Sequence, residues 1–253
     1  MKKLKKFIKR NFFSMFLRNK FNIRPSSNWE ILKKFSYSSV SDSFLWRTDN
    51  GFSTKFKFTD ILKLFYKHTN TKVELIFFNK KGERIKNVEL DNLNISNELI
   101  INSEFLNGIN DYGSFNIFHN LYEYSINTVI LNRCYLGYST NKKFYSFVHG
   151  NALTSSKTEK KIIREFYPTS FFSNINYNVQ NIMNDFSKTE VVVNNPTNED
   201  IRVTLEDNTM TLIPNETKII NLKKKKIKLK SNCHSLRPII FNYSSNFFDV
   251  YHG

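Results

Sequence analysis

The sequence predicts an all-β protein made of two β-sandwich or jelly-roll-like units, preceded by a basic amphipathic helix. Three observations carry this prediction. The 253 residues include a single alanine, Ala152, so the strongest helix former is nearly absent. Aromatic residues make up 15% of the chain, and they pack well on pleated sheets. Alternating segments recur at spacings of about 8–12 residues, as in sandwiches and jelly rolls.

The first segment, residues 1–40, is predicted to begin with a basic amphipathic helix. Residues 1–35 contain eleven Lys or Arg and one acidic residue, Glu30. Basic and apolar side chains separate onto opposite faces of the helical wheel. Such a helix can lie on an anionic membrane surface or pack its apolar face on its own domain. The residues expected to face a membrane are Lys2, Lys3, Lys5, Lys6, Phe7, Lys9, Arg10, Phe12 and Phe16.

The next segment, residues 41–151, is predicted to form the first β-sandwich unit. Phe56 and Phe58 alternate with lysines, which is the pattern of a half-buried strand. Residues 79–83 have the composition of a hairpin turn. Residues 59–66 fit either a short helix or a continued strand.

Residues 152–188 break this rhythm and are predicted to be an irregular connection. Strands are expected again in residues 189–253, which would form the second β-sandwich unit. That unit contains a lysine-rich strand with Lys228 and Lys230 on one face. Lysines discourage edge-to-edge pairing, so an edge position is expected. The alternative is a face that binds an anion or a polysaccharide.

The charge distribution disfavours a protein that grips duplex nucleic acid. The formal net charge is +16, but it is concentrated in residues 1–35 and in the lysine-rich strand. The rest of the chain is close to neutral, whereas duplex-binding proteins present a basic face. Nucleic acid is therefore the less favoured partner, and RNA binding through the basic N-terminal segment is kept as an alternative.

Cysteine usage and hydropathy predict a cytoplasmic protein, with peripheral attachment to the inner face of a membrane as an addition. Cys134 and Cys233 lack zinc-type spacing and are expected to be buried free thiols. The N-terminal apolar stretch is too short for a signal peptide and is closed by Arg18. No stretch of about 18 apolar residues is present to span a membrane.

The sequence lacks the common catalytic motifs. It contains no nucleotide-binding glycine loop, no HExxH metal motif and no GxSxG nucleophile elbow. The sequence therefore leaves the question of enzyme activity open and leans towards a non-catalytic protein. No cofactor is predicted, and a divalent metal is the alternative.

Polar residues embedded in apolar strands are the candidates for a binding site. Arg recognises carboxylate or phosphate groups with two parallel hydrogen bonds, and aromatic faces stack on sugar rings. The predicted residues for an anionic or sugar ligand are Trp46, Arg47, Arg133, Tyr138, His149, Asn151, Arg237 and His252. The alternative is that the arginines form structural ion pairs with Asp49 and Asp249. A metal site would use His149, His234, His252 and Asp249.

Five sequence pieces carry a resemblance: FLWRTDNGF, RCYLGYS, YSFVHGN, LRPIIF and DVYHG. Together they resemble a group of uncharacterised bacterial all-β proteins whose genes lie near genes for surface-polysaccharide synthesis. The resemblance covers roughly residues 40–253 and omits the basic segment. It implies a context in cell-envelope sugar metabolism or attachment, and it supplies no mechanism.

These observations lead to three function hypotheses. The first is a non-catalytic carbohydrate-related binding or scaffold protein, acting at the membrane surface in surface-polysaccharide metabolism. The second is a metal-dependent enzyme that acts on a sugar or sugar nucleotide. The third is an RNA-binding protein.

Overall fold

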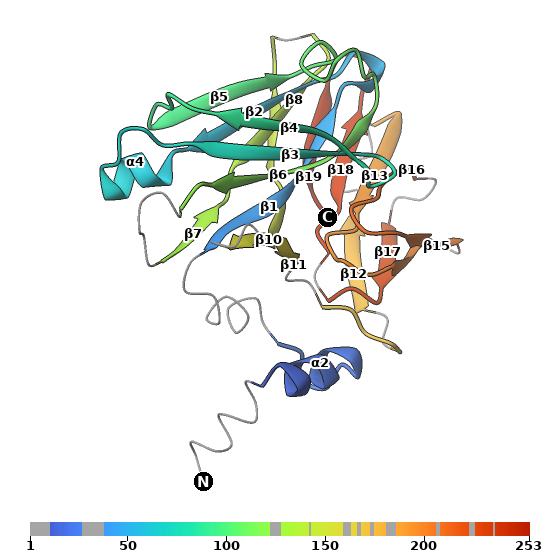
Figure 1. Cartoon of the computed structure of the whole chain (residues 1–253). Helices are drawn as coiled ribbons and strands as arrows, with labels where there is room; N and C mark the ends of the chain where they lie inside the picture. Colours follow the sequence, from blue (N-terminus) through green and yellow to red (C-terminus); the bar gives the residue numbers. More distant parts are fainter. Residues whose placement is uncertain are drawn as a thin grey trace.

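The chain is an all-β protein, as the sequence predicts (Figure 1). The computed structural model describes residues 11–26, 38–121, 128–141, 143–158, 163–165, 168–172, 175–180, 186–205, 208–222, 226–234 and 236–253. Within these ranges the strands form four sheets, and the two α-helices are α2 (Phe12–Lys20) and α4 (Ile61–Tyr66).

The largest sheet has the strand order β11-β10-β1-β6-β3-β4, and β7 also pairs with β1. Its strands are β1 (Ser38–Arg47), β3 (Val73–Asn79), β4 (Arg84–Leu90), β6 (Tyr112–His119), β7 (Val129–Asn132), β10 (Asn151–Thr158) and β11 (Ile163–Glu165). A bulge between Ser41 and Ser43 interrupts β1, which pairs with β10 as far as Ser43 and with β6 from Phe44 onward. Bulges bend a strand and redirect its side chains, which matters for the site below.

The second sheet has the order β5-β2-β8-β9. Its strands are β2 (Ser53–Thr59), β5 (Ser96–Ile101), β8 (Tyr135–Ser139) and β9 (Ser146–His149). Phe56 and Phe58 are buried, whereas Lys55 and Lys57 are not, which confirms the predicted alternation. Residues 59–66 fit either a helix or a strand from sequence, and the structure shows the helix α4 there. The Asp60 side chain caps its first turn, because it accepts a hydrogen bond from the Lys63 amide (3.1 Å).

The other two sheets are built from the C-terminal part of the chain. One has the order β16-β13-β18-β19, with β13 (Lys188–Asn194), β16 (Thr217–Asn221), β18 (Ile239–Tyr243) and β19 (Phe248–His252). The other has the order β12-β17-β14-β15, with β12 (Ile175–Gln180), β14 (Ile201–Leu205), β15 (Asn208–Leu212) and β17 (Lys226–Ser231).

The lysine-rich strand is not an edge strand, so that prediction is wrong. It is β17, and it pairs with β12 on one side and β14 on the other. Lys228 and Lys230 are exposed while Leu229 is fully buried. The lysines cover the solvent face of an interior strand, so their alternation reflects a half-buried sheet and not protection of an edge.

The sheets are arranged as a four-bladed, propeller-like ring and not as two jelly-roll sandwiches. The reason lies in the sheet of β13 and β18, which is buried on both faces. Val192 and Phe241 belong to the core shared with β1, β2 and β8. Val191 and Ile240 belong to a second core shared with β14 and β17. One sheet therefore serves both cores, which two independent sandwiches would not allow.

Residues 152–188, expected to be irregular, contain strand structure. They include most of β10, all of β11 and all of β12. In β12 the buried or half-buried Tyr177 and Val179 alternate with asparagines that lie opposite the lysines of β17. Asparagine is depleted in strands, so the asparagines of β12 hid its alternation of apolar and polar residues in the sequence.

Helix α2 belongs to the described part of the N-terminal segment, and only part of its apolar face is buried. Of its apolar side chains, Met15 is buried, whereas Phe13, Phe16 and Leu17 are exposed. The predicted membrane-facing residues before Asn11 lie outside the described residues, as does the side chain of Phe12. Within the described ranges, the helices are too short or too polar to cross a membrane.

Candidate functional site

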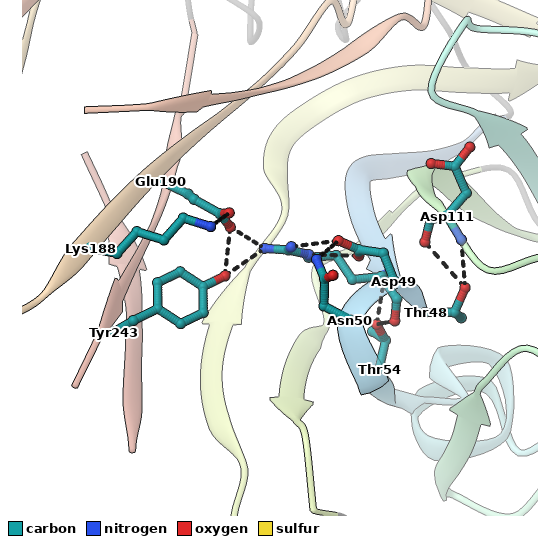
Figure 2. Close-up of polar contacts among 9 residues, drawn as sticks. Thr48, Asp49, Asn50, Thr54, Asp111, Lys188, Glu190 and Tyr243 are labelled. Atoms are coloured by element: carbon teal, nitrogen blue, oxygen red, sulfur yellow. Dashed lines mark hydrogen bonds and ion pairs between the residues drawn. The ribbon is translucent and has the colours of Figure 1, made fainter. Parts of the chain in front are cut away.

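Arg47 was a predicted ligand-binding residue, but the structure places it in the core. Its guanidinium forms two hydrogen bonds with the Asp49 carboxylate (2.9 and 2.7 Å) and one with Glu190 (2.8 Å). It also donates to the Tyr243 hydroxyl (3.0 Å). Figure 2 shows Asp49 on one side of this network and Glu190, Tyr243 and Lys188 on the other. Every charge is matched, so the structural ion-pair alternative is correct for Arg47.

Trp46 and Tyr138 also belong to the core and not to a binding site. Both side chains are fully buried. The Trp46 indole Nε1 donates to the carbonyl of Phe78 (2.9 Å), and the Tyr138 hydroxyl donates to the carbonyl of Leu45 (2.8 Å). Buried indoles and phenols normally find such partners, so neither residue has a group left for a ligand.

The other five predicted residues converge, together with Asp42, in one place. We call this set the arginine–histidine cluster, and its members are Asp42, Arg133, His149, Asn151, Arg237 and His252. In the described part of the chain, seven buried side-chain atoms have no hydrogen-bond partner. Six of them belong to this cluster. These six are Asp42 Oδ2, His149 Nδ1, Asn151 Oδ1, Arg237 Nη1, and Nδ1 and Nε2 of His252. Buried polar atoms are rarely left unpaired, so the cluster requires an explanation.

Strand ends from three sheets bring these residues together. His149 ends β9 and His252 ends β19, and their rings stack with centroids 6.2 Å apart and an interplanar angle of 10°. Tyr135, at the start of β8, is paired directly with His149 across β8 and β9, and its ring lies 4.4 Å from the His149 ring on the same face of the sheet. Arg133 occupies the short link between β7 and β8, where the chain crosses from one sheet to another.

The backbone is unusual at Asp42 and at its partner. Asp42 lies at the β1 bulge, and its Oδ1 accepts a hydrogen bond from the amide of Leu153 (2.7 Å). Leu153 has φ of 53°, a left-handed conformation that is strained for a leucine. Bulges and strained residues are concentrated at functional sites because they re-aim side chains.

Gly150 separates two cluster residues, His149 and Asn151, and only glycine fits there. A Cβ at this position would lie 2.5 Å from the carbonyl oxygen of Ser43 and 2.7 Å from the ring of Phe44. The close approach of the two backbones therefore requires a glycine between His149, which pairs with β8, and Asn151, which pairs with Ser43 of β1.

The cluster carries excess positive charge at neutral pH. Burial raises the pKa of Asp42 to about 7, although the Leu153 amide, Arg133 and Arg237 oppose the shift. Burial also lowers the pKa of His252 to about 4, with Arg237 and His149 adding to this effect and the Pro238 carbonyl opposing it. Two guanidinium groups thus face one carboxyl that is only partly ionised, which leaves a place for an anion.

Part of the cluster is open to solvent. The Arg133 side chain is 49% exposed, and its Nε lies 4.0 Å from Asp42 Oδ2. Tyr135 is 52% exposed beside His149. Deeper in, Asn151 and Arg237 line a cavity of about 10 Å³, which has room for about one water molecule. A ligand could therefore reach Arg133, Tyr135 and His149 from the surface.

The predicted metal residues are not brought together. The part of the chain that the structure describes contains no group of three or more His, Cys, Asp or Glu residues that could hold a metal ion. The Nε2 atom of His234 lies 3.0 Å from the carbonyl oxygen of Asn19, at the end of α2. Asp249 accepts a hydrogen bond from Ser146 (3.3 Å) instead of facing the histidine pair. Only His149 and His252 are neighbours.

A second buried polar network contains an Asp–His pair but is fully bonded. The Asp60 carboxylate lies 3.4 Å from Nε2 of His119, whose Nδ1 lies 2.6 Å from the amide oxygen of Asn132. Asn132 donates in turn to the hydroxyl of Ser39 (2.8 Å). All these side chains are buried, so the network ties α4 to the sheet and offers no reactive group.

Cys134 is not an activated nucleophile. The cysteines are buried and free, as predicted. Burial raises the pKa of the Cys134 thiol well above its ordinary value, and the nearby Asp42 adds to this effect. The thiol is therefore protonated at neutral pH, whereas a nucleophilic cysteine needs a depressed pKa.

Sequence reasoning missed Asp42 and Tyr135. Asp42 stands alone among serines and apolar residues at the start of β1, and a lone acid in such a stretch is a signal for a buried carboxyl. Tyr135 follows Arg133 by two residues and was passed over in favour of Tyr138. Its register opposite His149 could not be read from the sequence.

No protein-family model matches this chain, and no curated protein matches it. The resemblance drawn from the sequence pieces therefore stays a prediction.

Proposed function

We propose that this protein is a non-catalytic carbohydrate-binding or scaffold protein that binds the anionic group of an acidic sugar at the arginine–histidine cluster. The observation that carries the proposal is the set of six unpaired buried polar atoms around Arg237, His149 and His252. A site with unmet hydrogen bonds and excess positive charge gains most from a carboxylate or phosphate.

The site favours binding over catalysis. A hydrolytic site needs a general acid and a base or nucleophile, placed on either side of the reacting bond. Here Asp42 is the only carboxyl in the cluster, and it lies inside the bulge with one oxygen held by the Leu153 amide. Aromatic Tyr135 and basic Arg133 stand at the surface, where they suit recognition of a sugar ring and its charged group.

The test uses glucuronate and glucose 1-phosphate as anionic probes and glucose as the neutral one. We expect the anionic sugars to bind the full-length protein and glucose to bind much more weakly, measured by calorimetry. Arg133→Gln should weaken anion binding about tenfold to a hundredfold, because it removes a charged hydrogen-bond donor. Arg84→Gln, an exposed arginine on β4, is the matched control and should bind like the wild type.

Two results would overturn this function. One is that neither anionic sugar binds at about 10 mM, a concentration at which even weak sites are occupied. The other is that Arg133→Gln and Arg84→Gln bind the anionic sugars equally well. In either case the unpaired atoms of the cluster would have to be satisfied by water alone.

An anionic membrane surface is proposed as the second partner. Exposed large apolar side chains lie on α2, on the residues just after it and on the segment 168–172, and they are Phe13, Phe16, Leu17, Phe21, Ile23, Phe171 and Phe172. The rings of Phe171 and Phe172 lie 6.2 and 6.0 Å from that of Phe21. Large exposed patches of this kind mark interaction sites.

The two parts of this patch are fixed to each other. The buried Lys20 ammonium bonds to Glu199 and to the hydroxyl of Thr169 (2.6 Å). The Phe171 amide donates to the carbonyl of Lys20 (2.8 Å). The sequence from residue 1 to residue 26 contains nine basic residues and no acidic one. Apolar side chains beside a basic segment suit an anionic interface such as the cytoplasmic face of a membrane.

Vesicle sedimentation tests this partner. We expect the protein to pellet with vesicles that contain phosphatidylglycerol and to stay in solution with pure phosphatidylcholine. Phe171→Ser combined with Phe172→Ser should reduce pelleting about tenfold or more, because two apolar contacts are lost. Phe65→Ser, at an equally exposed phenylalanine on α4, is the control. Equal pelleting of the double variant and the control would contradict the proposal, as would no pelleting of the wild type.

A further inference from the structure

A row of aromatic side chains runs along the outer face of the sheet formed by β2, β8 and β9. We call it the aromatic strip, and it consists of Tyr145, Phe147, His149 and Tyr135. The rings of Tyr145 and Phe147 have centroids 6.2 Å apart, and those of Tyr135 and His149 are 4.4 Å apart. Phe147 is 42% exposed, so its ring is available to a ligand. Alternate residues of a strand share a face, so Phe147 and His149 of β9 lie on the same face, and Tyr145 directly precedes the strand.

The sheet makes room for Phe147. Gly137 lies opposite it in the pairing of β8 with β9. A Cβ on Gly137 would lie 2.7 Å from Cε1 and 2.8 Å from Cζ of the Phe147 ring. The ring therefore rests over the glycine, and any larger residue at position 137 would push it away from the sheet.

A pocket lies at one end of the strip and the arginine–histidine cluster lies at the other. The pocket measures about 280 Å³, and its lining combines aromatic rings with amide and hydroxyl groups: Thr140, Asn141, Phe144, Tyr145, Ser146, Asn246, Phe247 and Phe248. Tyr145 belongs to both the pocket and the strip, and His149 belongs to both the strip and the cluster. Aromatic faces with a few neutral polar groups suit an uncharged sugar ring.

The strip and its two ends are too long for one sugar. Tyr145 directly precedes β9 and His149 ends it, so an extended backbone places these two residues about 13 Å apart. From these observations we propose that the aromatic strip binds an extended acidic glycan, with a charged sugar at the cluster and neutral sugars along Phe147 and in the pocket. This inference rests on the proposed function and names its ligand class as a chain of sugars.

The charges along the strip favour a glycan over single-stranded RNA. Lys55 and Lys57 lie over the rings of Tyr145 and Phe147, with Nζ atoms 4.5 and 5.4 Å from the ring centres. Both lysines also share the carboxylate of Glu98, at 2.8 and 3.6 Å. RNA carries a phosphate at every nucleotide and is bound in grooves with free positive charge. A chain with only intermittent charge fits a strip whose lysines are partly neutralised.

The experiment measures how affinity depends on chain length. The probes are hyaluronan disaccharide and hexasaccharide, which alternate charged and neutral sugars, and the same full-length protein is titrated with each. We expect the hexasaccharide to bind at least about tenfold more tightly than the disaccharide. Phe147→Leu should remove most of this difference, because it keeps an apolar cover over Gly137 but loses the flat ring. It should leave glucuronate binding unchanged.

Phe65→Leu, at an exposed phenylalanine on α4, is the matched control and should bind both oligosaccharides like the wild type. If glucuronate binds but the disaccharide and hexasaccharide bind equally, the strip is not a glycan site while the proposed function stands. If glucuronate itself does not bind, the proposed function is wrong, and the inference that rests on it is wrong as well. Binding of oligouridylate that depends on Phe147, with no gain from the longer glycan, would overturn the inference in favour of RNA.

Discussion

Replacing Arg47 with methionine is expected to lower the free energy of unfolding by about 3–5 kcal/mol, the usual cost of removing one partner of a buried ion pair. Arg47 is fully buried and bonded to Asp49 and Glu190, and its guanidinium lies 4.3 Å from the ring centre of Phe52. Without it, Glu190 keeps only Lys188 and Tyr243 as partners in a site shielded from water. Urea unfolding at neutral pH measures the effect.

The electrostatic cause can be separated from lost packing by a second variant. Arg47→Met combined with Glu190→Met should recover much of the loss, because a buried pair replaced by apolar groups is often tolerated. Lys188→Met is the control for an exposed partner of the same carboxylate and should change stability by about 1 kcal/mol or less. A cost for Arg47→Met as small as that of Lys188→Met would show that the network does not hold the core together.

This network also explains why the chain is not two independent units. Arg47 ends β1, whereas Glu190 and Tyr243 belong to β13 and β18. Burial raises the pKa of Glu190, but hydrogen bonds from Lys188 and Tyr243 and the charge of Arg47 outweigh it and leave the pKa below its ordinary value. Glu190 is therefore ionised at neutral pH, and one of the two carboxylates that bond to Arg47 comes from the other half of the sequence.

The sequence was informative about strands and poor at their arrangement. Alternation at Phe56 and Phe58 identifies a half-buried strand, because the period of two is a local property. The pairing of β1 with both β10 and β6 depends on a bulge at Ser41, which has no composition signal. The same limit applies to β13, whose run of valines is buried on both faces and fits a sandwich strand equally well.

The candidate site was predicted in part for a physical reason. A charged or polar residue between apolar neighbours in a strand needs a partner or a ligand, and the sequence shows which residues are in that position. It cannot show which of them find partners. Arg47 finds Glu190 on a distant strand, whereas Arg237 Nη1 and His149 Nδ1 find no hydrogen-bond partner among the described residues. Only the fold separates the structural arginine from the cluster.

Asp42→Asn is expected to flatten the pH dependence of stability between about pH 4 and pH 7. The pKa of Asp42 is raised to about 7 in the folded protein, above its ordinary value of 3.8. The folded state therefore holds a proton that the unfolded state has released, so stability falls as pH rises through this window. A shift of about three units corresponds to about 4 kcal/mol. Urea unfolding at pH 4 and pH 8 measures it, with Asp91→Asn as an exposed control.

The same carboxyl should couple anion binding to proton uptake. Ionised Asp42 repels an anion at the cluster, so a bound anion favours the neutral acid and raises its pKa further. Affinity for glucuronate should then fall as pH rises above about 7, and this fall should disappear in Asp42→Asn. The groups that face Asp42 are Arg133, Arg237 and Cys134, and the raised pKa of the Cys134 thiol keeps it protonated in this range. His252, with a pKa of about 4, is neutral throughout this range.

His149→Gln removes the remaining imidazole of the cluster and tests whether it contributes to the pH dependence of glucuronate affinity. If the pH dependence survives in Asp42→Asn but vanishes in His149→Gln, the imidazole and not the carboxyl controls anion binding. If it vanishes in Asp42→Asn alone, the buried carboxyl at the β1 bulge regulates the cluster. The bulge would then have a function beyond bending the strand, because it holds one acid where its charge opposes the ligand and its neutral form admits it.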